Sequence, residues 1–130
     1  METDAEVINA CLEHVASNDV DIAAAVYQNF ASHMPQASAQ MAHMDDRMRG
    51  RMLEQVYKLL LNEVDTGYLE FETDMHKGYG ADIAAYQRLL QAVKNAVKTE
   101  MSTNWNTVHD TAWNRSIDRI VGDIQQIAAK

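Results

Sequence analysis

The stretch DMHKGYGADIAAYQ (residues 74–87) decides how the rest of the chain is interpreted, because it joins two helical patterns around one histidine. A short helix is predicted over about residues 68–77, and Gly78 follows it, as glycine often follows the last residue of a helix. A longer helix is predicted over about residues 82–101, because its apolar residues recur at helical spacing: Ile83, Tyr86, Leu90, Val93 and Val97. His76 therefore lies near the end of one helix, and Tyr86 lies on the inner face of the next.

The first two predicted helices cover about residues 3–17 and 20–34. Polar residues interrupt the pattern between them, and Asn18 or Asp19 is the candidate N-cap of the second helix. Pro35 either ends this second helix or begins a short one of its own. The expected inner faces carry Val7, Ile8, Cys11, Leu12 and Val15 in the first helix, and Ala23, Tyr27, Phe30 and Met34 in the second.

Two more helices complete the pattern. One runs from Asp45 or Asp46 to about Val64, and the last follows STN (residues 102–104), which is expected to cap it. Their expected inner faces carry Met48, Met52, Val56 and Leu59 or Leu60 in the former, and Trp113, Ile117, Ile120, Ile124 and Ile127 in the latter. Strand patterns are weak throughout, so the sequence predicts an all-α fold of six to eight helices in a single domain over residues 1–130.

Composition and charge narrow the classes of partner. The formal net charge is −8, which disfavours binding to nucleic acid or to anionic membrane surfaces. Cys11 is the single cysteine and has no internal disulfide partner, as is typical of a reducing compartment. The acidic start METDAEV lacks the pattern of a signal peptide, and no apolar run is long enough for a membrane span. We expect a cytoplasmic protein.

The histidines and the methionines are the two groups of residues that bear on ligand binding. The five histidines show no HExxH or CxxC spacing, and neither a GxSxG motif nor a Gly-rich phosphate loop is present, which disfavours zinc, hydrolase and nucleotide chemistry. Five methionines crowd one region: Met34, Met41, Met44, Met48 and Met52. These flexible thioether side chains either fill an irregular core or line a pocket for a large flat ligand, and the two interpretations are compatible.

The spacing around His76 resembles the proximal side of globins, most of all the bacterial single-domain globins and the globin domain of flavohaemoglobins. Tyr79, Gly80, Ala81 and Tyr86 follow His76 by three, four, five and ten residues. In those globins a histidine near the end of the sixth helix precedes a tight Tyr-Gly-Val-like corner and a tyrosine in the seventh helix. VYQNFASHMP (residues 26–35) is similar to the second globin helix, and TAWNRSIDRIV (residues 111–121) is similar to the last.

The resemblance implies a globin fold and a haem b cofactor (iron protoporphyrin IX). His76 would be the iron ligand, as a neutral imidazole, and would leave the opposite face of the iron open to a diatomic gas such as dioxygen, NO or CO. Tyr79 and Tyr86 would brace the proximal side, or would simply be core aromatic residues with a hydroxyl at the rim.

On the distal side, the resemblance assigns Tyr27 as a hydrogen-bond donor to the gas. Met41 stands where globins usually have a phenylalanine against the haem. The usual distal glutamine or histidine falls on Arg51 or Met52, and Met52 is the better match because it turns Val56 inward. Met41, Met52 and Val56 would form an apolar lining that excludes water. His43 or a methionine is an alternative ligand for the sixth coordination position.

Other function classes stay open. The protein is alternatively a gas or redox sensor that signals through a partner, or a haem-free globin-fold module that binds a ligand or another protein through its Met-rich region. Nitric oxide dioxygenase or peroxidase activity would require a separate reductase, because no flavin or nicotinamide domain fits in 130 residues. We therefore expect binding rather than catalysis.

Overall fold

The computed structural model describes residues 2–19, 21–40, 45–62 and 83–128. Within these ranges every regular element is helical, so the prediction of an all-α protein is confirmed for the described chain. The elements are α1 (Asp4–Ser17), α2 (Ala23–His33), α3 (Pro35–Gln40), α4 (Asp46–Leu60), α6 (Ile83–Met101), the 3₁₀ helix η1 (Ser102–Asn104) and α7 (Thr107–Ala128). The predicted helix over residues 68–77 lies outside the described residues.

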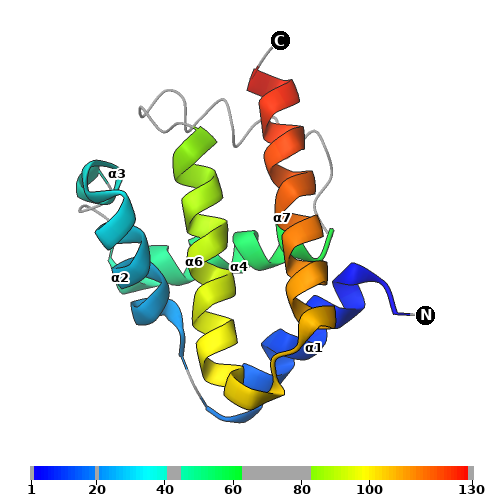
Figure 1. Ribbon diagram of the computed structural model, residues 1–130. Helices are drawn as coiled ribbons and strands as arrows, with labels where there is room; N and C mark the ends of the chain where they lie inside the picture. Colours follow the sequence, from blue (N-terminus) through cyan, green and yellow to red (C-terminus); the bar gives the residue numbers. More distant parts are fainter. Residues whose placement is uncertain (1, 20, 41–44, 63–82, 129–130) are drawn as a thin grey trace.

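The helices α6 and α7 form the centre of the structure. Figure 1 shows them side by side and running in opposite directions, joined at one end by η1. The helix α2 packs on α6, and α1 packs on both α6 and α7. The helix α4 crosses the direction of this central pair and contacts α2 and α7. The chain thus surrounds two long helices with shorter ones.

The core follows the predicted apolar faces closely. Trp113 and Ile117 of α7 and Val93 and Val97 of α6 are at most 1% exposed. Burying a large apolar side chain stabilises the folded state by about 1.5–3 kcal/mol. The described residues of the expected faces in α1, α6 and α7 that are buried are Val7, Ile8, Cys11, Val15, Leu90, Val93, Val97, Trp113, Ile117, Ile120 and Ile124. Helical periodicity therefore located the inner surfaces of these helices.

The predicted caps were wrong at two helix starts. Asn18 is the C-cap of α1, and Asp19 takes a left-handed backbone conformation (φ 56°), so both residues end α1 and do not begin α2. The Asp21 carboxylate instead accepts a hydrogen bond from the Ala23 N–H (2.9 Å). At α7, residues 102–104 form η1, and the Asn106 side chain accepts from the N–H of Val108 (2.9 Å). Short polar residues suit both helix ends and turns, which is why the sequence alone misplaced these caps.

The helix α4 differs from its prediction in length and rotation. The helix begins at Asp46, one of the two predicted first residues. The Asp45 side chain caps it by accepting a hydrogen bond from the Met48 N–H (2.9 Å). It ends at Leu60, before the expected Val64, and Asn62 follows with a left-handed φ of 59°, which is common just beyond a helix end.

The helix α4 is rotated about its axis relative to the prediction, so that a different set of residues faces the core. Met48 was expected to face inward and is 42% exposed, so that prediction was wrong. Leu53, Val56 and Leu60 are buried, and Arg49 rather than Met48 continues their stripe by one more turn toward the start of the helix.

Candidate functional site between α2 and α4

Tyr27 of α2 meets Arg49 of α4 through two contacts. The partly buried Tyr27 hydroxyl donates a hydrogen bond to the Arg49 carbonyl oxygen (2.9 Å). The Arg49 guanidinium carbon lies 5.3 Å from the centre of the Tyr27 ring, within the range of a cation–π interaction. The Tyr27 side chain therefore contacts both the backbone carbonyl and the guanidinium of Arg49. These contacts join α2 to the beginning of α4.

The environment keeps the Tyr27 phenol neutral. Burial raises the pKa of Tyr27 to about 12, Arg49 opposes this rise, and the nearby Tyr57 of α4 adds to it. Burial also raises the pKa of Tyr57, and the negative charge of Asp21 acts in the same direction. Both phenols thus carry their protons at physiological pH, and Tyr27 is a hydrogen-bond donor.

Arg49 has a donor that no described residue uses. Its Nε atom is buried and has no hydrogen-bond partner in the described part of the chain. Leaving a buried donor unpaired costs roughly 1–3 kcal/mol, and such a group in a folded protein requires an explanation. The guanidinium is always protonated, so this donor carries a positive charge. The site therefore combines a neutral phenol with a charged N–H donor that has no acceptor among the described residues.

Two of the three apolar residues that the resemblance assigns to the distal side lie along the same face of α4 as Arg49. Met52 and Val56 follow Arg49 by three and seven residues, which places all three on one side of the helix. Val56 is buried and Met52 is partly buried, whereas Arg51 is exposed. Of the two candidates for the distal position, Met52 is the one on the inner side of α4.

The remaining predicted site residues divide into two groups. Tyr86 of α6 is partly buried and packs against the core, on a helix that contacts α2. His76, Tyr79, Met41 and His43 lie outside the described residues. The structure thus brings Tyr27 to α4, shows Met52 and Val56 on the inner side of α4, and shows Tyr86 on a helix that packs against α2.

Sequence reasoning missed Arg49 as a site residue. The available signal was its position on the inner stripe of α4, one turn before Leu53 and two turns before Val56 or Tyr57. Arginine is mostly exposed in proteins, and the helical spacing of Met48, Met52 and Val56 predicts Met48 on the inner face instead. The rotation of α4 is fixed by the contact between Arg49 and Tyr27.

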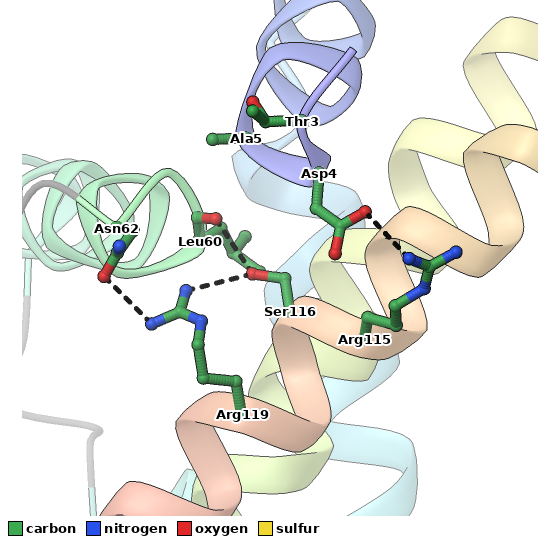
Figure 2. Close-up of a pocket in the computed structure, with 8 residues that line it drawn as sticks. All are labelled: Thr3, Asp4, Ala5, Leu60, Asn62, Arg115, Ser116 and Arg119. Atoms are coloured by element: carbon green, nitrogen blue, oxygen red, sulfur yellow. Dashed lines mark hydrogen bonds and ion pairs between the residues drawn. The ribbon is translucent and has the colours of Figure 1, made fainter. Parts of the chain in front are cut away.

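A second candidate lies on another side of the molecule, where the first turn of α1, the end of α4 and the middle of α7 line a small pocket of about 230 Å³ that is open to solvent (Figure 2). Arg119 donates to the Leu59 carbonyl (2.9 Å) and to the Asn62 side chain (3.1 Å), and Ser116 donates to the Leu60 carbonyl (2.8 Å). These bonds satisfy carbonyl groups at the end of α4, where the helix offers no donors of its own. The residues around this pocket therefore have a structural role, because they hold α7 against the end of α4.

A third polar cluster ties α6 to α7. The Lys94 side chain is largely buried and pairs with Asp110 (3.0 Å) and with the Asn114 side-chain oxygen (2.7 Å). The hydrogen bond from Lys94 is the main reason that the pKa of the Asp110 carboxyl lies below its ordinary value. Each charged group here has its partner, so this cluster is also structural.

Two structural features are absent from the described residues. No group of three or more His, Cys, Asp or Glu side chains gathers there to hold a metal ion. This result does not bear on a haem site, in which one histidine outside the described residues would bind the iron. None of the described helices combines the length and the apolar character needed to cross a membrane.

Comparison with known protein families and curated proteins assigns the chain to no family. No protein-family model matches the chain. The search of curated proteins likewise found no match. The described chain is an all-α protein in which Tyr27 of α2 donates to the Arg49 carbonyl of α4, and in which the buried Arg49 Nε atom has no hydrogen-bond partner among the described residues.

Proposed function

We propose that the protein is a globin-like protein, a single domain over residues 1–130, that binds haem b through His76 and reversibly binds a diatomic gas. The observation that carries this proposal is the position of Tyr27. Its protonated phenol is partly buried and lies against the inner side of α4, the helix that also carries Met52 and Val56. This is the arrangement that the resemblance requires of a distal donor and its apolar surroundings.

Three described residues of α4 support the proposal by their chemistry. Arg49 has a buried Nε donor without a partner among the described residues, and Met52 and Val56 are apolar residues further along the same side of the helix. Haem, when bound, supplies an iron atom with one position open to a small molecule. His76 would hold this iron, and Tyr79 and Tyr86 would support the histidine side.

On the gas side, Met41, Met52 and Val56 would exclude water, and the Tyr27 hydroxyl would donate a hydrogen bond to the gas. The phenol has only one proton, and in this structure the Arg49 carbonyl accepts it. Donation to the gas therefore requires the hydroxyl to leave this carbonyl. A hydrogen bond to a partly charged acceptor is worth roughly 1.5–3 kcal/mol, so the exchange favours the gas when its oxygen carries negative charge.

The cellular setting and the partners belong to the same proposal. The net charge of −8 and the single cysteine support a cytoplasmic protein with neither nucleic acid nor a membrane as its partner. A gas-binding protein of this kind acts as an oxygen carrier, or as a sensor with a signalling partner. Catalysis of NO oxidation or of peroxide reduction would depend on a separate reductase.

The proposal is tested by absorption spectroscopy of the purified protein. Haemin titration of the full chain should give a Soret band, and His76→Ala should lose it or recover it only with added imidazole. His33→Ala is the matched control, because His33 is exposed at the end of α2 and should leave the spectrum unchanged. Wild-type protein that takes up no haemin contradicts the proposal.

A further inference from the structure

We propose that the pocket lined by α1, α4 and α7 binds a small oxyanion of the phosphate class between the guanidinium groups of Arg115 and Arg119. Both side chains line this pocket, together with Thr3 and Asp4 at the start of α1 (Figure 2). The inference does not depend on haem, because it uses only described residues on a different side of the molecule from Tyr27. Its basis is the number of N–H donors and the balance of charge in the pocket.

Arg119 is held in a fixed position and still has unused donors. Its Nη1 atom donates to the Asn62 side chain (3.1 Å), and its Nη2 atom donates to the Leu59 carbonyl (2.9 Å) and the Ser116 hydroxyl (3.3 Å). A guanidinium has five N–H donors, so the Nε–H and one Nη1–H have no acceptor among the described residues. Because the three bonds already order this side chain, a ligand that binds here loses little affinity to side-chain ordering.

Arg115 has more donors available than Arg119. Its side chain is 67% exposed, and none of its N–H groups forms a hydrogen bond with a described residue. The nearest Asp4 carboxylate oxygen lies 3.8 Å from Nη1, beyond the range of about 2.7–3.2 Å that is typical of an N–H···O hydrogen bond. Asp4 therefore attracts the charge of Arg115 without using its donors.

The pocket has an excess of positive charge. Arg115 and Arg119 lie four residues apart on the same side of α7, and like charges at this spacing repel each other. Asp4 is the only acidic residue that lines the pocket, and Arg119 forms no ion pair with a described carboxylate. Two arginines and one aspartate leave one positive charge uncompensated, although the net charge of the chain is −8. An anion between the two arginines would supply both the missing charge and the missing acceptors.

The size and lining of the pocket restrict the ligand. A volume of about 230 Å³ that is open to solvent suits a small polar group and not a large apolar one. A phosphate group has several oxygen atoms and accepts paired N–H donors from a guanidinium. Thr3 adds a further donor, because its oxygen accepts from the Glu6 N–H (3.1 Å) while its own proton has no acceptor among the described residues. Inorganic phosphate and the phosphoryl group of a small ester share this chemistry.

Asp4 would compete with such a ligand for Arg115. The Asp4 side chain is 39% exposed, and its carboxylate accepts no hydrogen bond from a described residue. It can therefore turn toward solvent at little cost when phosphate approaches Arg115. Removing the charge of Asp4 should strengthen phosphate binding, whereas removing the charge of Arg115 should weaken it.

The test is a titration of inorganic phosphate into purified full-length protein, followed by amide chemical shifts in NMR spectra at constant ionic strength. Arg115→Gln should weaken phosphate binding by about three- to tenfold, because the lost contact is charge-assisted but largely exposed to solvent. Asp4→Asn should strengthen it by about two- to fivefold, because a competing charge is removed. Arg88→Gln is the matched control, since Arg88 is exposed on α6, does not line the pocket and should leave the affinity unchanged.

Two further measurements complete the design. Helical circular dichroism and the thermal unfolding midpoint verify that each variant is folded before titration. Arg119 is not substituted, because its bonds hold α7 to the end of α4. A parallel titration with glycerol 3-phosphate distinguishes the two sources of the phosphate group. Tighter binding of the ester assigns the site to esters, and tighter binding of inorganic phosphate assigns it to the free anion.

The outcomes decide the inference independently of haem. Opposite shifts of phosphate affinity in Arg115→Gln and Asp4→Asn support it. Equal weakening in Arg115→Gln and Arg88→Gln overturns it, because binding then responds only to the net charge of the protein. Wild-type protein without saturable phosphate binding, or weaker binding in Asp4→Asn, also overturns it. A protein that takes up no haemin leaves this test unchanged, so the failure of one proposal is distinguishable from the failure of the other.

Discussion

The Tyr27–Arg49 hydrogen bond provides a quantitative test of how α2 is held against α4. Tyr27→Phe removes the hydroxyl and keeps the ring, so the Arg49 guanidinium retains its contact at 5.3 Å. The lost bond is 2.9 Å long and partly buried. A neutral hydrogen bond of this kind contributes about 0.5–1.5 kcal/mol to stability. The Arg49 carbonyl is not left unpaired, because it lies inside α4 and accepts the regular helical bond.

The expected loss is therefore about 1 kcal/mol in the free energy of unfolding, measured by urea denaturation of the haem-free protein. With a urea dependence of about 1–3 kcal/mol per molar, the midpoint should fall by roughly 0.3–1 M. Tyr57→Phe is the matched control. Tyr57 is also partly buried, and its hydroxyl makes no hydrogen bond to any residue that the structure describes, so its removal should change stability by less than about 0.5 kcal/mol. Equal losses in the two variants refute the argument, because the bond to Arg49 would then contribute nothing of its own.

The same substitution tests the distal role of Tyr27 in haem-loaded protein. If Tyr27 donates to dioxygen, Tyr27→Phe should raise the dioxygen release rate roughly ten- to hundredfold. The equilibrium affinity should fall by less than this factor. In wild-type protein the bond to the gas replaces the bond to Arg49, and the difference between the two central values is about 1 kcal/mol, or roughly five- to tenfold. An unchanged release rate excludes Tyr27 as the donor.

Two further predictions concern the structural joints. Ser116→Ala removes the buried hydrogen bond to the Leu60 carbonyl and should lower the free energy of unfolding by about 1 kcal/mol in urea titration, whereas no change would show that this bond does not secure the end of α4. For Asp110→Asn, the depressed pKa of the Asp110 carboxyl means that its pairing with Lys94 stabilises the fold above the ordinary aspartate pKa, and that this stabilisation is lost as pH falls through the lowered value. The wild type should exceed the variant by less than about 1 kcal/mol at neutral pH, because Asp110 is solvent-exposed, and this advantage should vanish in acid; a difference that does not vary with pH contradicts the assignment.

Helix positions and inner faces were predictable because they depend on local periodicity. The apolar residues of α1 recur at helical spacing, and Val7, Ile8, Cys11 and Val15 are all buried. The same holds for α7, whose inner stripe includes Trp113 and Ile117. Any helix with one strongly apolar face must turn that face toward the core, whatever it packs against. Sequence alone is sufficient for this level of structure.

Helix ends were less predictable because several polar residues compete for each end. Asn18, Asp19 and Asp21 all lie between the first two helices, and each is a chemically acceptable cap. Only Asp21 accepts from the backbone of α2, since the chain first turns through the left-handed conformation of Asp19. That choice is made by the direction in which α2 must leave to reach α6, which is a property of tertiary packing.

The candidate site was predictable in part for the same reasons. Tyr27, Met52 and Val56 were located by resemblance and by spacing, and the structure shows them buried or partly buried on α2 and α4. Arg49 was not located, because its inward position depends on how α4 is rotated against α2. A charged side chain is stable in a partly buried position only when a neighbouring residue interacts favourably with its charge. The neighbour here is Tyr27, which lies 22 residues earlier in the sequence.

The exposed Met48 and the inward Arg49 are consequences of a single rotation of α4. Adjacent helical residues point about 100° apart, so Met48 and Arg49 cannot both face α2. The contact that decides between them is the Tyr27 ring, which accepts the guanidinium on its face while its hydroxyl binds the Arg49 carbonyl. This rotation also brings Met52 to the inner side and leaves Arg51 in solvent. Arg49 thus fixes the rotation of α4 through its contact with Tyr27, and its Nε donor has no partner among the described residues. A substitution of Arg49 therefore tests the rotation of α4 as well as the role of this donor.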